Sequence, residues 1–185
     1  MNLKNIKLKK KIDILKSYEF KKYKTKKEKK IILINIAGNK NKPASQEQLK
    51  FKALEEGTFY ARDLVSEPGN ILHPDEYAKR LSSLKKDGLK VTIYDEKKLK
   101  QLGMYSLLGV GQGSIRGSYL VTMEWNGAKN NSNPLAFVGK GVCFDTGGYS
   151  LKPAKFMEDM TYDMAGSAVV VGLMKSLALR KAKVN

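Results

Sequence analysis

Apolar and polar positions along the chain follow two kinds of pattern, one typical of strands and one typical of helices. Short apolar runs and alternating stretches predict strands over residues 31–36, 89–94, 119–125 and 135–142. Amphipathic stretches between them predict helices over residues 45–65, 74–88, 96–102 and 161–181. Because strands alternate with helices, we expect an α/β fold with a mostly parallel or mixed sheet flanked by helices.

Signals at the ends of the predicted helices support these boundaries. Ser45 and Gln48 have the spacing of a capping box, and Pro74 suits the first position of a helix. Gly103 suits the residue after a helix end, whereas Gly57 weakens the first helix internally. The apolar run 135–142 is expected to be the central strand of the sheet.

Composition places the chain among ordinary globular proteins. Its 185 residues, 42% of them hydrophobic, suffice for one domain with a core. No stretch approaches 18 uninterrupted apolar residues, and the N-terminus lacks the apolar region of a secretory signal, so we expect no membrane span and no export. The single cysteine, Cys143, cannot form an internal disulfide, which fits a reducing compartment.

Positive charge is concentrated near the N-terminus. The net charge is +17, and residues 1–30 alone hold 13 lysines against three acidic residues. Such an arm can bind nucleic acid or anionic lipid by releasing counterions. The alternative is a solvated segment without a ligand, which the absence of arginine and the few aromatic residues favour.

Candidate chemistry is densest between residues 138 and 163. Lys140 ends the predicted central strand, and Asp145 follows in a glycine-rich turn. Lys152 and Asp163 come within one further loop and the start of the last predicted helix. Two carboxylates with lysines and no nearby histidine favour a hard divalent cation over a nucleophilic triad. By spacing alone, the pattern indicates a metal or anion site.

Other catalytic constellations find little support in the chain. His73 is the only histidine, so histidine-pair zinc sites and triads with serine or cysteine are excluded within these residues. Cys143 has no histidine partner and is expected to pack in the core. The glycines of residues 109–114 do not have the spacing of a dinucleotide-binding loop.

Residues 138–153 read V-G-K-G-V-C-F-D-T-G-G-Y-S-L-K-P. This string resembles the metal-binding signature of the leucyl (cytosol) aminopeptidase family, V-G-K-G-x-x-F-D-[ST]-G-G-x-x-x-K-P. Further similarity over residues 61–65, 68–70 and 103–114 extends the resemblance to about residues 48–185. The resemblance implies a cytoplasmic, homo-hexameric exopeptidase that releases N-terminal amino acids from peptides. It also implies hydrolysis by water activated by two cations, Mn²⁺ or Zn²⁺, with Mg²⁺ or Co²⁺ as substitutes.

The same resemblance implies a role for each residue that matches the signature. Lys140, Asp145 and Asp163 would be metal ligands, with Asp145 bridging two cations and Lys140 binding as a neutral amine. Asp163 would also face the free α-amine of the substrate. Lys152 would stay protonated and act catalytically by stabilising the oxyanion, and Met160 would line the pocket for the first side chain of the substrate.

Each of these residues also has a purely structural alternative. Lys140 could point into solvent, and Lys152 could be a solvated loop lysine. Asp145 could cap the turn that follows it, and Asp163 could complement the positive end of a helix. Met160 could belong to the core.

The resemblance also divides the chain into two parts. Residues 1–44 would be a lysine-rich segment with one strand, the remnant of an N-terminal domain. Residues 45–185 would be a partial metallo-aminopeptidase catalytic domain, incomplete at its C-terminal end. We therefore expect at most one weakly bound cation and little or no activity from this chain alone. The alternatives are a non-catalytic nucleic-acid-binding protein and a split or degraded gene product.

Tyr149 departs from the small aliphatic residue usual in the family and could crowd the loop.

Overall fold

The computed structural model describes residues 14–25, 45–128 and 133–185. The strand expected at residues 31–36, and with it most of the proposed N-terminal segment, lies outside these ranges. The elements in chain order are α2 (Ser45–Ser66), α3 (Pro74–Ser82), η1 (Ser83–Asp87), β1 (Lys90–Tyr94), α4 (Glu96–Gln101), α5 (Tyr105–Gly111), β2 (Leu120–Glu124), α6 (Ala154–Met157), η2 (Glu158–Tyr162) and α7 (Ala165–Leu179).

Helices and a small sheet confirm the α/β class, with β1 and β2 paired antiparallel in the register Lys90 opposite Glu124. Within the described residues no parallel pair of strands forms. The prediction of a central strand at residues 135–142 is wrong, because this segment is not a strand in the structure. That segment is irregular, and Val138 is 97% exposed. A strand is stabilised by backbone bonds to a neighbouring strand, and neither β1 nor β2 supplies them here.

Most predicted helix ends agree with the structure, but the last helix, predicted from residue 161, begins at Ala165. His73 caps α3 by accepting a hydrogen bond at Nδ1 from the backbone N–H of Glu76, 3.4 Å away. Gly88 ends η1 in the left-handed region at φ 94°, and Gly103 follows α4 at φ 72°. The short helix α5 is an addition that the apolar pattern did not predict.

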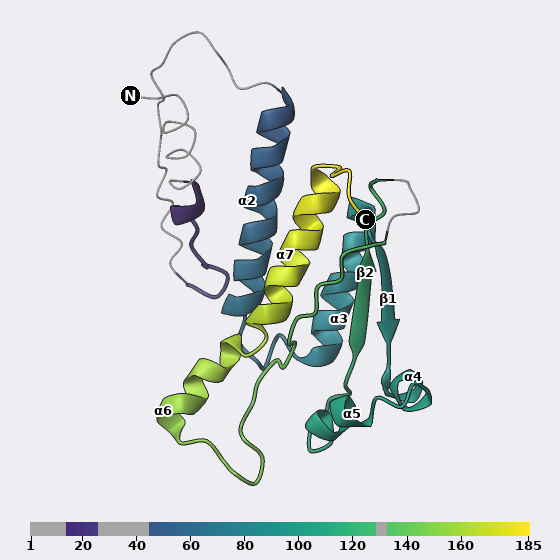
Figure 1. Cartoon of the computed structure of the whole chain (residues 1–185). Helices are drawn as coiled ribbons and strands as arrows, with labels where there is room; N and C mark the ends of the chain where they lie inside the picture. Colours follow the sequence, from purple (N-terminus) through teal and green to yellow (C-terminus); the bar gives the residue numbers. More distant parts are fainter. Residues whose placement is uncertain (1–13, 26–44, 129–132) are drawn as a thin grey trace.

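The core lies between α7, α3 and the sheet, with α2 running beside α7 (Figure 1). Its largest fully buried side chains come from separate parts of the chain and are Leu64, Leu72, Leu84, Leu99, Met164 and Val171. Burial of side chains of this size stabilises a fold by about 1.5–3 kcal/mol each. The core therefore fixes α7 against the elements that precede it by about 100 residues.

Two glycines let α2 and α7 approach each other closely. A Cβ atom added to Gly57 would lie 2.4 Å from the carbonyl oxygen of Gly172 and 2.0 Å from Oγ of Ser176. Ser176 Oγ in turn donates a hydrogen bond of 3.0 Å to the carbonyl oxygen of Ala53. The glycine that weakens the helix in isolation is thus needed for its packing.

Within the described residues, the stretch Ala154–Leu179, made up of α6, η2 and α7, is long and apolar enough to cross a membrane by length and composition alone. Core helices of globular proteins share these properties. Its main part, α7, packs along α2, and Lys175 forms an ion pair of 2.9 Å with Asp87 next to the ring of Tyr60. These contacts are typical of a core helix.

The described part of the basic arm, residues 14–25, is bound to the C-terminal end of α2 through Glu67. Glu67 is only 2% exposed and accepts hydrogen bonds from Lys22, from the Tyr23 hydroxyl at 2.5 Å and from Arg80 Nη1 at 3.1 Å. Burial by itself raises the pKa of Glu67, but these three donors outweigh it and lower the pKa. Lys22 is therefore a structural residue.

The helix contact at Gly57 can be tested by substitution. Gly57→Ala should lower the free energy of unfolding by about 1–3 kcal/mol, because the added methyl group overpacks the contact with α7. Urea unfolding followed by circular dichroism measures the change. The matched control is Gly109→Ala, where the added Cβ meets no atom within 4 Å and helix propensity predicts a stability gain of about 0.4–1 kcal/mol. Equal effects of the two variants would contradict the packing role.

The buried carboxylate of Glu67 predicts a pH-dependent contribution to stability. Because its folded pKa lies below the unfolded value of about 4.3, the contribution is complete above that value and declines as the pH falls through the folded pKa. Glu67→Gln should cost about 1–3 kcal/mol at neutral pH, and the difference from the unsubstituted chain should narrow below about pH 4. Urea unfolding across this range measures it, with the exposed Glu158→Gln as a control. A difference independent of pH would show that the charge is not involved.

Candidate metal centre

The candidate site residues lie on one stretch between β2 and α7. Lys140, Asp145 and Lys152 are on the irregular segment that precedes α6, and Met160 is in η2. Asp163 follows η2 as its C-terminal cap, and α7 begins only at Ala165. The expectation that Asp163 occupies the first turn of the last helix is therefore wrong, because η2 separates from α7 at this residue.

Lys140 and Asp163 form the first of two pairs. Lys140 Nζ lies 2.9 Å from Asp163 Oδ1, and the side chains are 59% and 18% exposed. The other carboxylate oxygen of Asp163, Oδ2, is buried and has no hydrogen-bond partner among the described residues. A buried oxygen without a donor costs stability, and a bound cation or ammonium group would satisfy it.

The backbone of Lys140 is held against the start of α7. The N–H of Ser167 donates a hydrogen bond of 2.9 Å to the carbonyl oxygen of Lys140. A Cβ on the preceding Gly139 would come within 2.5 Å of Ser167 Cα, so only glycine permits this approach. Ser167 Oγ also donates to the carbonyl oxygen of Met164 at 2.8 Å and contacts the Tyr77 hydroxyl at 2.9 Å.

Tyr77 and Ser167 are site-supporting residues that sequence reasoning missed. Tyr77 is buried, and this burial raises its pKa well above the ordinary value, so its hydroxyl stays protonated at Ser167. In the sequence, only the small residues Gly166 and Ser167 indicated that another segment could pack closely against the start of α7. The partner on α3, 90 positions away in the sequence, could not be inferred from a local pattern.

Asp145 and Lys152 form the second pair, with Lys152 Nζ 3.7 Å from Asp145 Oδ2. Asp145 Oδ1 accepts a hydrogen bond of 2.8 Å from the N–H of Gly147, so one oxygen of this carboxylate caps the glycine turn. Gly147 and Gly148 adopt φ values of 90° and 64°, which favour glycine. The N–H of Lys152 closes the loop on the carbonyl oxygen of Thr146 at 2.9 Å.

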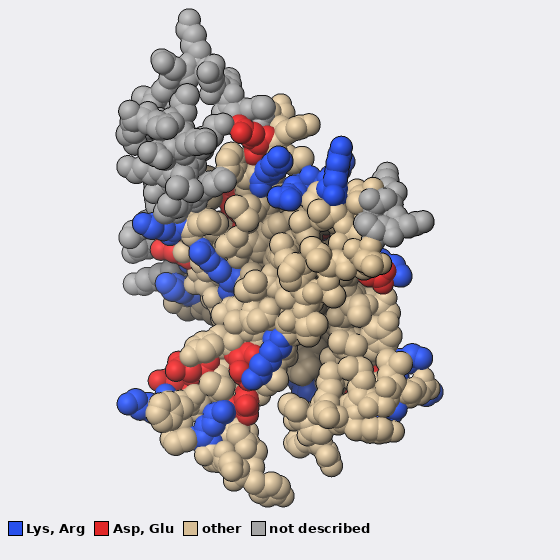
Figure 2. Space-filling view, in the orientation of Figure 1, with Lys and Arg blue, Asp and Glu red and all other residues tan. Residues whose placement is uncertain are grey.

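The structure therefore organises the four charged residues as two lysine–aspartate pairs. No hydrogen bond or ion pair connects one pair to the other within the described ranges. Across the same ranges, no group of three or more histidine, cysteine, aspartate or glutamate residues has the arrangement of a metal site. Figure 2 shows acidic and basic side chains gathered over α6 and η2 at the lower left.

Two further residues of the signature region differ in their surroundings. Met160 is partly exposed and does not belong to the main core cluster. Tyr149 is fully exposed and does not crowd the glycine turn. The departure at Tyr149 thus leaves the loop conformation intact.

Cys143 is 6% exposed and belongs to the core cluster, as the sequence predicted. Burial, with a smaller effect of the negative charge of Asp75, raises its pKa to about 12. The thiol is therefore protonated at neutral pH and is unsuited to nucleophilic catalysis.

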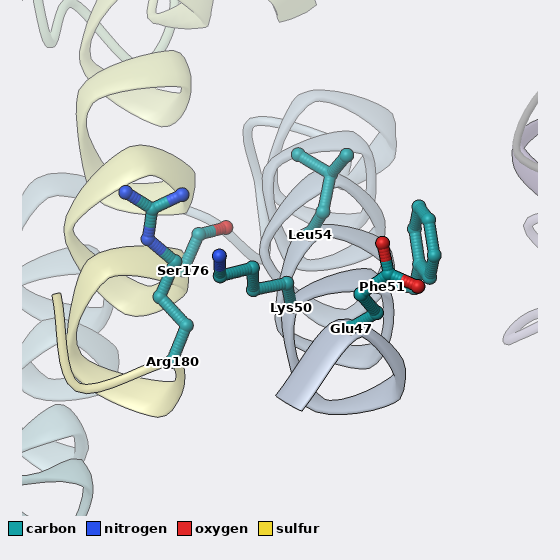
Figure 3. A pocket seen from close by; sticks show the side chains of 6 residues that line it. All are labelled: Glu47, Lys50, Phe51, Leu54, Ser176 and Arg180. Carbon is teal, nitrogen blue, oxygen red and sulfur yellow. The ribbon is translucent and has the colours of Figure 1, made fainter. Parts of the chain in front are cut away.

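A pocket of about 270 Å³ between α2 and α7 lies apart from these residues (Figure 3). Its lining consists of Glu47, Lys50, Phe51, Leu54, Ser176 and Arg180. Its lining residues Ser176 and Arg180 lie at the C-terminal end of α7, whereas Asp163 precedes the N-terminal end of that helix. The pocket shares no residue with the signature, so it is separate from the candidate site.

Comparison with known proteins agrees with the signature. The profile described as "Cytosol aminopeptidase family, catalytic domain" matches residues 59–185. A probable cytosol aminopeptidase from Caulobacter vibrioides is 53% identical over 176 residues, covering 92% of this chain and 36% of the relative. One from Brucella ovis is 51% identical over 178 residues, covering 93% and 36% respectively.

Two solved structures share the fold. The bottromycin maturation enzyme BotP in complex with Mn superposes with a TM-score of 0.74 at 30% identity, covering 91% of this chain and 35% of that one. The cytosol aminopeptidase of Coxiella burnetii gives 0.73 at 26% identity, covering 92% and 35%.

The matched relatives are named as aminopeptidases, which are peptidases. The chain belongs to the cytosol aminopeptidase family. It spans about a third of the length of the curated relatives that it matches.

The buried state of Cys143 predicts low thiol reactivity. A pKa near 12 reduces the thiolate fraction at pH 8 by roughly a thousandfold relative to an ordinary cysteine. Alkylation by iodoacetamide, measured by mass spectrometry, should therefore be very slow in the native chain and rapid in urea. Fast alkylation of the native chain would contradict both the burial of Cys143 and its structural role.

Proposed function

We propose that this chain contributes metal-binding and substrate-binding residues to an aminopeptidase active site that removes N-terminal residues from peptides. The observation that carries the proposal is the buried, unpartnered oxygen of Asp163 beside Lys140, inside the family signature. That oxygen faces no donor, so the residues fit a positively charged ligand. Family membership and the Mn complex of the similar enzyme BotP support a divalent cation.

In this proposal Lys140, Asp145 and Asp163 hold the cation. Carboxylate oxygens and an amine nitrogen suit Mn²⁺ or Zn²⁺, with Mg²⁺ or Co²⁺ as weaker substitutes. When bound, the cation supplies Lewis acidity and an activated water for peptide hydrolysis. Lys140 can take part only after it gives up the proton with which it now binds Asp163.

The remaining roles belong to charged groups that would act directly on the peptide. Asp163 provides a negative charge for the free α-amine of the substrate, which explains a requirement for a free N-terminus. Lys152 provides a positive charge for the oxyanion that develops on the scissile carbonyl. Its contact with Asp145 is long, at 3.7 Å, so little energy is needed to release it. Met160 lies in η2 beside Asp163 and would contact the first side chain of the substrate.

The affinity of the chain alone for a cation is expected to be low. The described residues contain only two candidate carboxylates, and each is already neutralised by a lysine. A cation must compete with both ammonium groups. We therefore propose weak binding of one cation and no efficient hydrolysis by this chain alone.

The names of its relatives support a cytoplasmic location.

Calorimetric titration with MnCl₂ at neutral pH tests the metal site. We expect one weak site, with affinity reduced at least about tenfold in Asp163→Ala, because that variant removes the unpartnered oxygen. Asp159→Ala, an exposed aspartate of η2, is the matched control and should bind as the unsubstituted chain does. Absence of Mn²⁺ uptake, or equal loss in both variants, would refute the metal site.

Hydrolysis of Leu-p-nitroanilide in the presence of Mn²⁺ tests the catalytic capacity of the same chain. No turnover is expected from the purified chain. Turnover that disappears in Asp145→Ala would instead show that two carboxylates suffice, and it would overturn the proposed dependence on further residues.

A further inference from the structure

The packing register of α2 against α7 continues from the glycine contact towards the N-terminal end of α2. One turn along, the carbonyl oxygen of Ala53 on α2 accepts a hydrogen bond of 3.0 Å from Ser176 Oγ on α7. Residues three or four apart share one face of a helix. The next pair in this register is therefore Lys50 on α2 and Arg180, which caps the C-terminal end of α7.

Lys50 and Arg180 line the same pocket, whose volume is about 270 Å³. In Figure 3 both side chains extend towards the space between the two helices, whereas the carboxylate of Glu47 lies on the side of α2 near Phe51. Within the described ranges, neither cation takes part in an ion pair. Two like charges that face each other repel, and an anion bound between them would remove this repulsion.

The rest of the lining determines what kind of anion the pocket suits. Leu54 is 42% exposed and Phe51 is partly exposed, so both offer apolar surface to a ligand. The hydroxyl proton of Ser176 is already donated to Ala53, so the charge of the ligand is left to the two cations. Pockets for drug-sized ligands have volumes of about 300–1,000 Å³, and the smaller volume here favours a small ligand.

We propose that this pocket binds a small organic anion, with a carboxylate or phosphate group between Lys50 and Arg180 and a short apolar group against Leu54. A guanidinium group donates two parallel hydrogen bonds to such an oxyanion, and an ammonium group adds a compact positive charge. The bound anion joins α2 to α7 and so stabilises the folded chain. Because the site uses no residue of the family signature, it goes beyond the proposed aminopeptidase function and needs neither a metal nor a peptide.

Amide NMR spectra of the whole, isotope-labelled chain in buffer with EDTA test the proposal. Isocaproate and isobutyl phosphate are titrated separately, and isocaproamide is the uncharged counterpart of the same shape. At least one anion should shift the signals of Lys50 and of Arg180 Nε–H in a saturable way, and the amide should not. The anion with the lower dissociation constant identifies the preferred acidic group.

Three results of this titration would overturn the proposal. One is the absence of a saturable shift with both anions, and another is an equal response to the amide. The third is a shift of the same size at an exposed lysine far from the pocket, such as Lys100 on α4, because it would show non-specific attraction to a basic chain.

Substitution of the two cations locates the site. Lys50→Gln and Arg180→Gln should each raise the dissociation constant of the tighter anion at least about tenfold, because each removes a charged hydrogen-bond donor. The matched control is Lys52→Gln, a lysine of the same helix that is 75% exposed and does not line the pocket. It should change the dissociation constant by less than about twofold. Equal losses in all three variants would contradict a site between Lys50 and Arg180.

Urea unfolding provides an independent readout, with sodium chloride at equal ionic strength as the reference. The tighter anion should raise the unfolding midpoint of the unsubstituted chain and of Lys52→Gln, and it should leave the midpoint of Arg180→Gln unchanged. A rise of the same size in Arg180→Gln would refute the site. Since EDTA is present throughout, failure of the metal site would not alter these readouts, so the two proposals are tested separately.

Discussion

The close approach of α2 and α7 at Gly57 and Gly172 is the contact on which the rest of the structure depends. It fixes the axis of α7, and with it the position of Ser167 in the first turn of that helix. Ser167 holds the backbone of Lys140 and is itself contacted by Tyr77. The packing of α2 against α7 at Gly172 therefore determines where Ser167 holds the candidate metal ligand, about one and a half helical turns away.

The four charged residues of the candidate site neutralise one another in two pairs. Asp163 is paired with Lys140, and Asp145 is paired with Lys152, so each partly buried carboxylate has a counter-charge. The same lysines are the groups that we propose for metal binding and oxyanion stabilisation. One set of residues thus serves as internal ion pairs in the isolated chain and as chemical groups in the proposed active site. Within the candidate site as described, the buried oxygen Oδ2 of Asp163 has no hydrogen-bond partner.

Local patterns predicted much of the secondary structure. The helix predicted at residues 45–65 became α2, and the capping signals around Pro74 and Gly88 correctly bounded α3 with η1. The strands near residues 89–94 and 119–125 also form. The segment 135–142 was predicted wrongly, because its apolar composition is that of a buried strand while no described strand lies beside it.

The sequence by itself determined the family signature, most of the helix boundaries and the chemical character of the candidate residues, because these depend on neighbours a few positions apart. Only the tertiary structure decided that β1 and β2 pair antiparallel, that Tyr77 reaches Ser167, and which lysine neutralises which aspartate. Strand pairing and ion pairing join residues distant in the chain. Their partners are set by how the helices pack, and local periodicity carries no information about that packing.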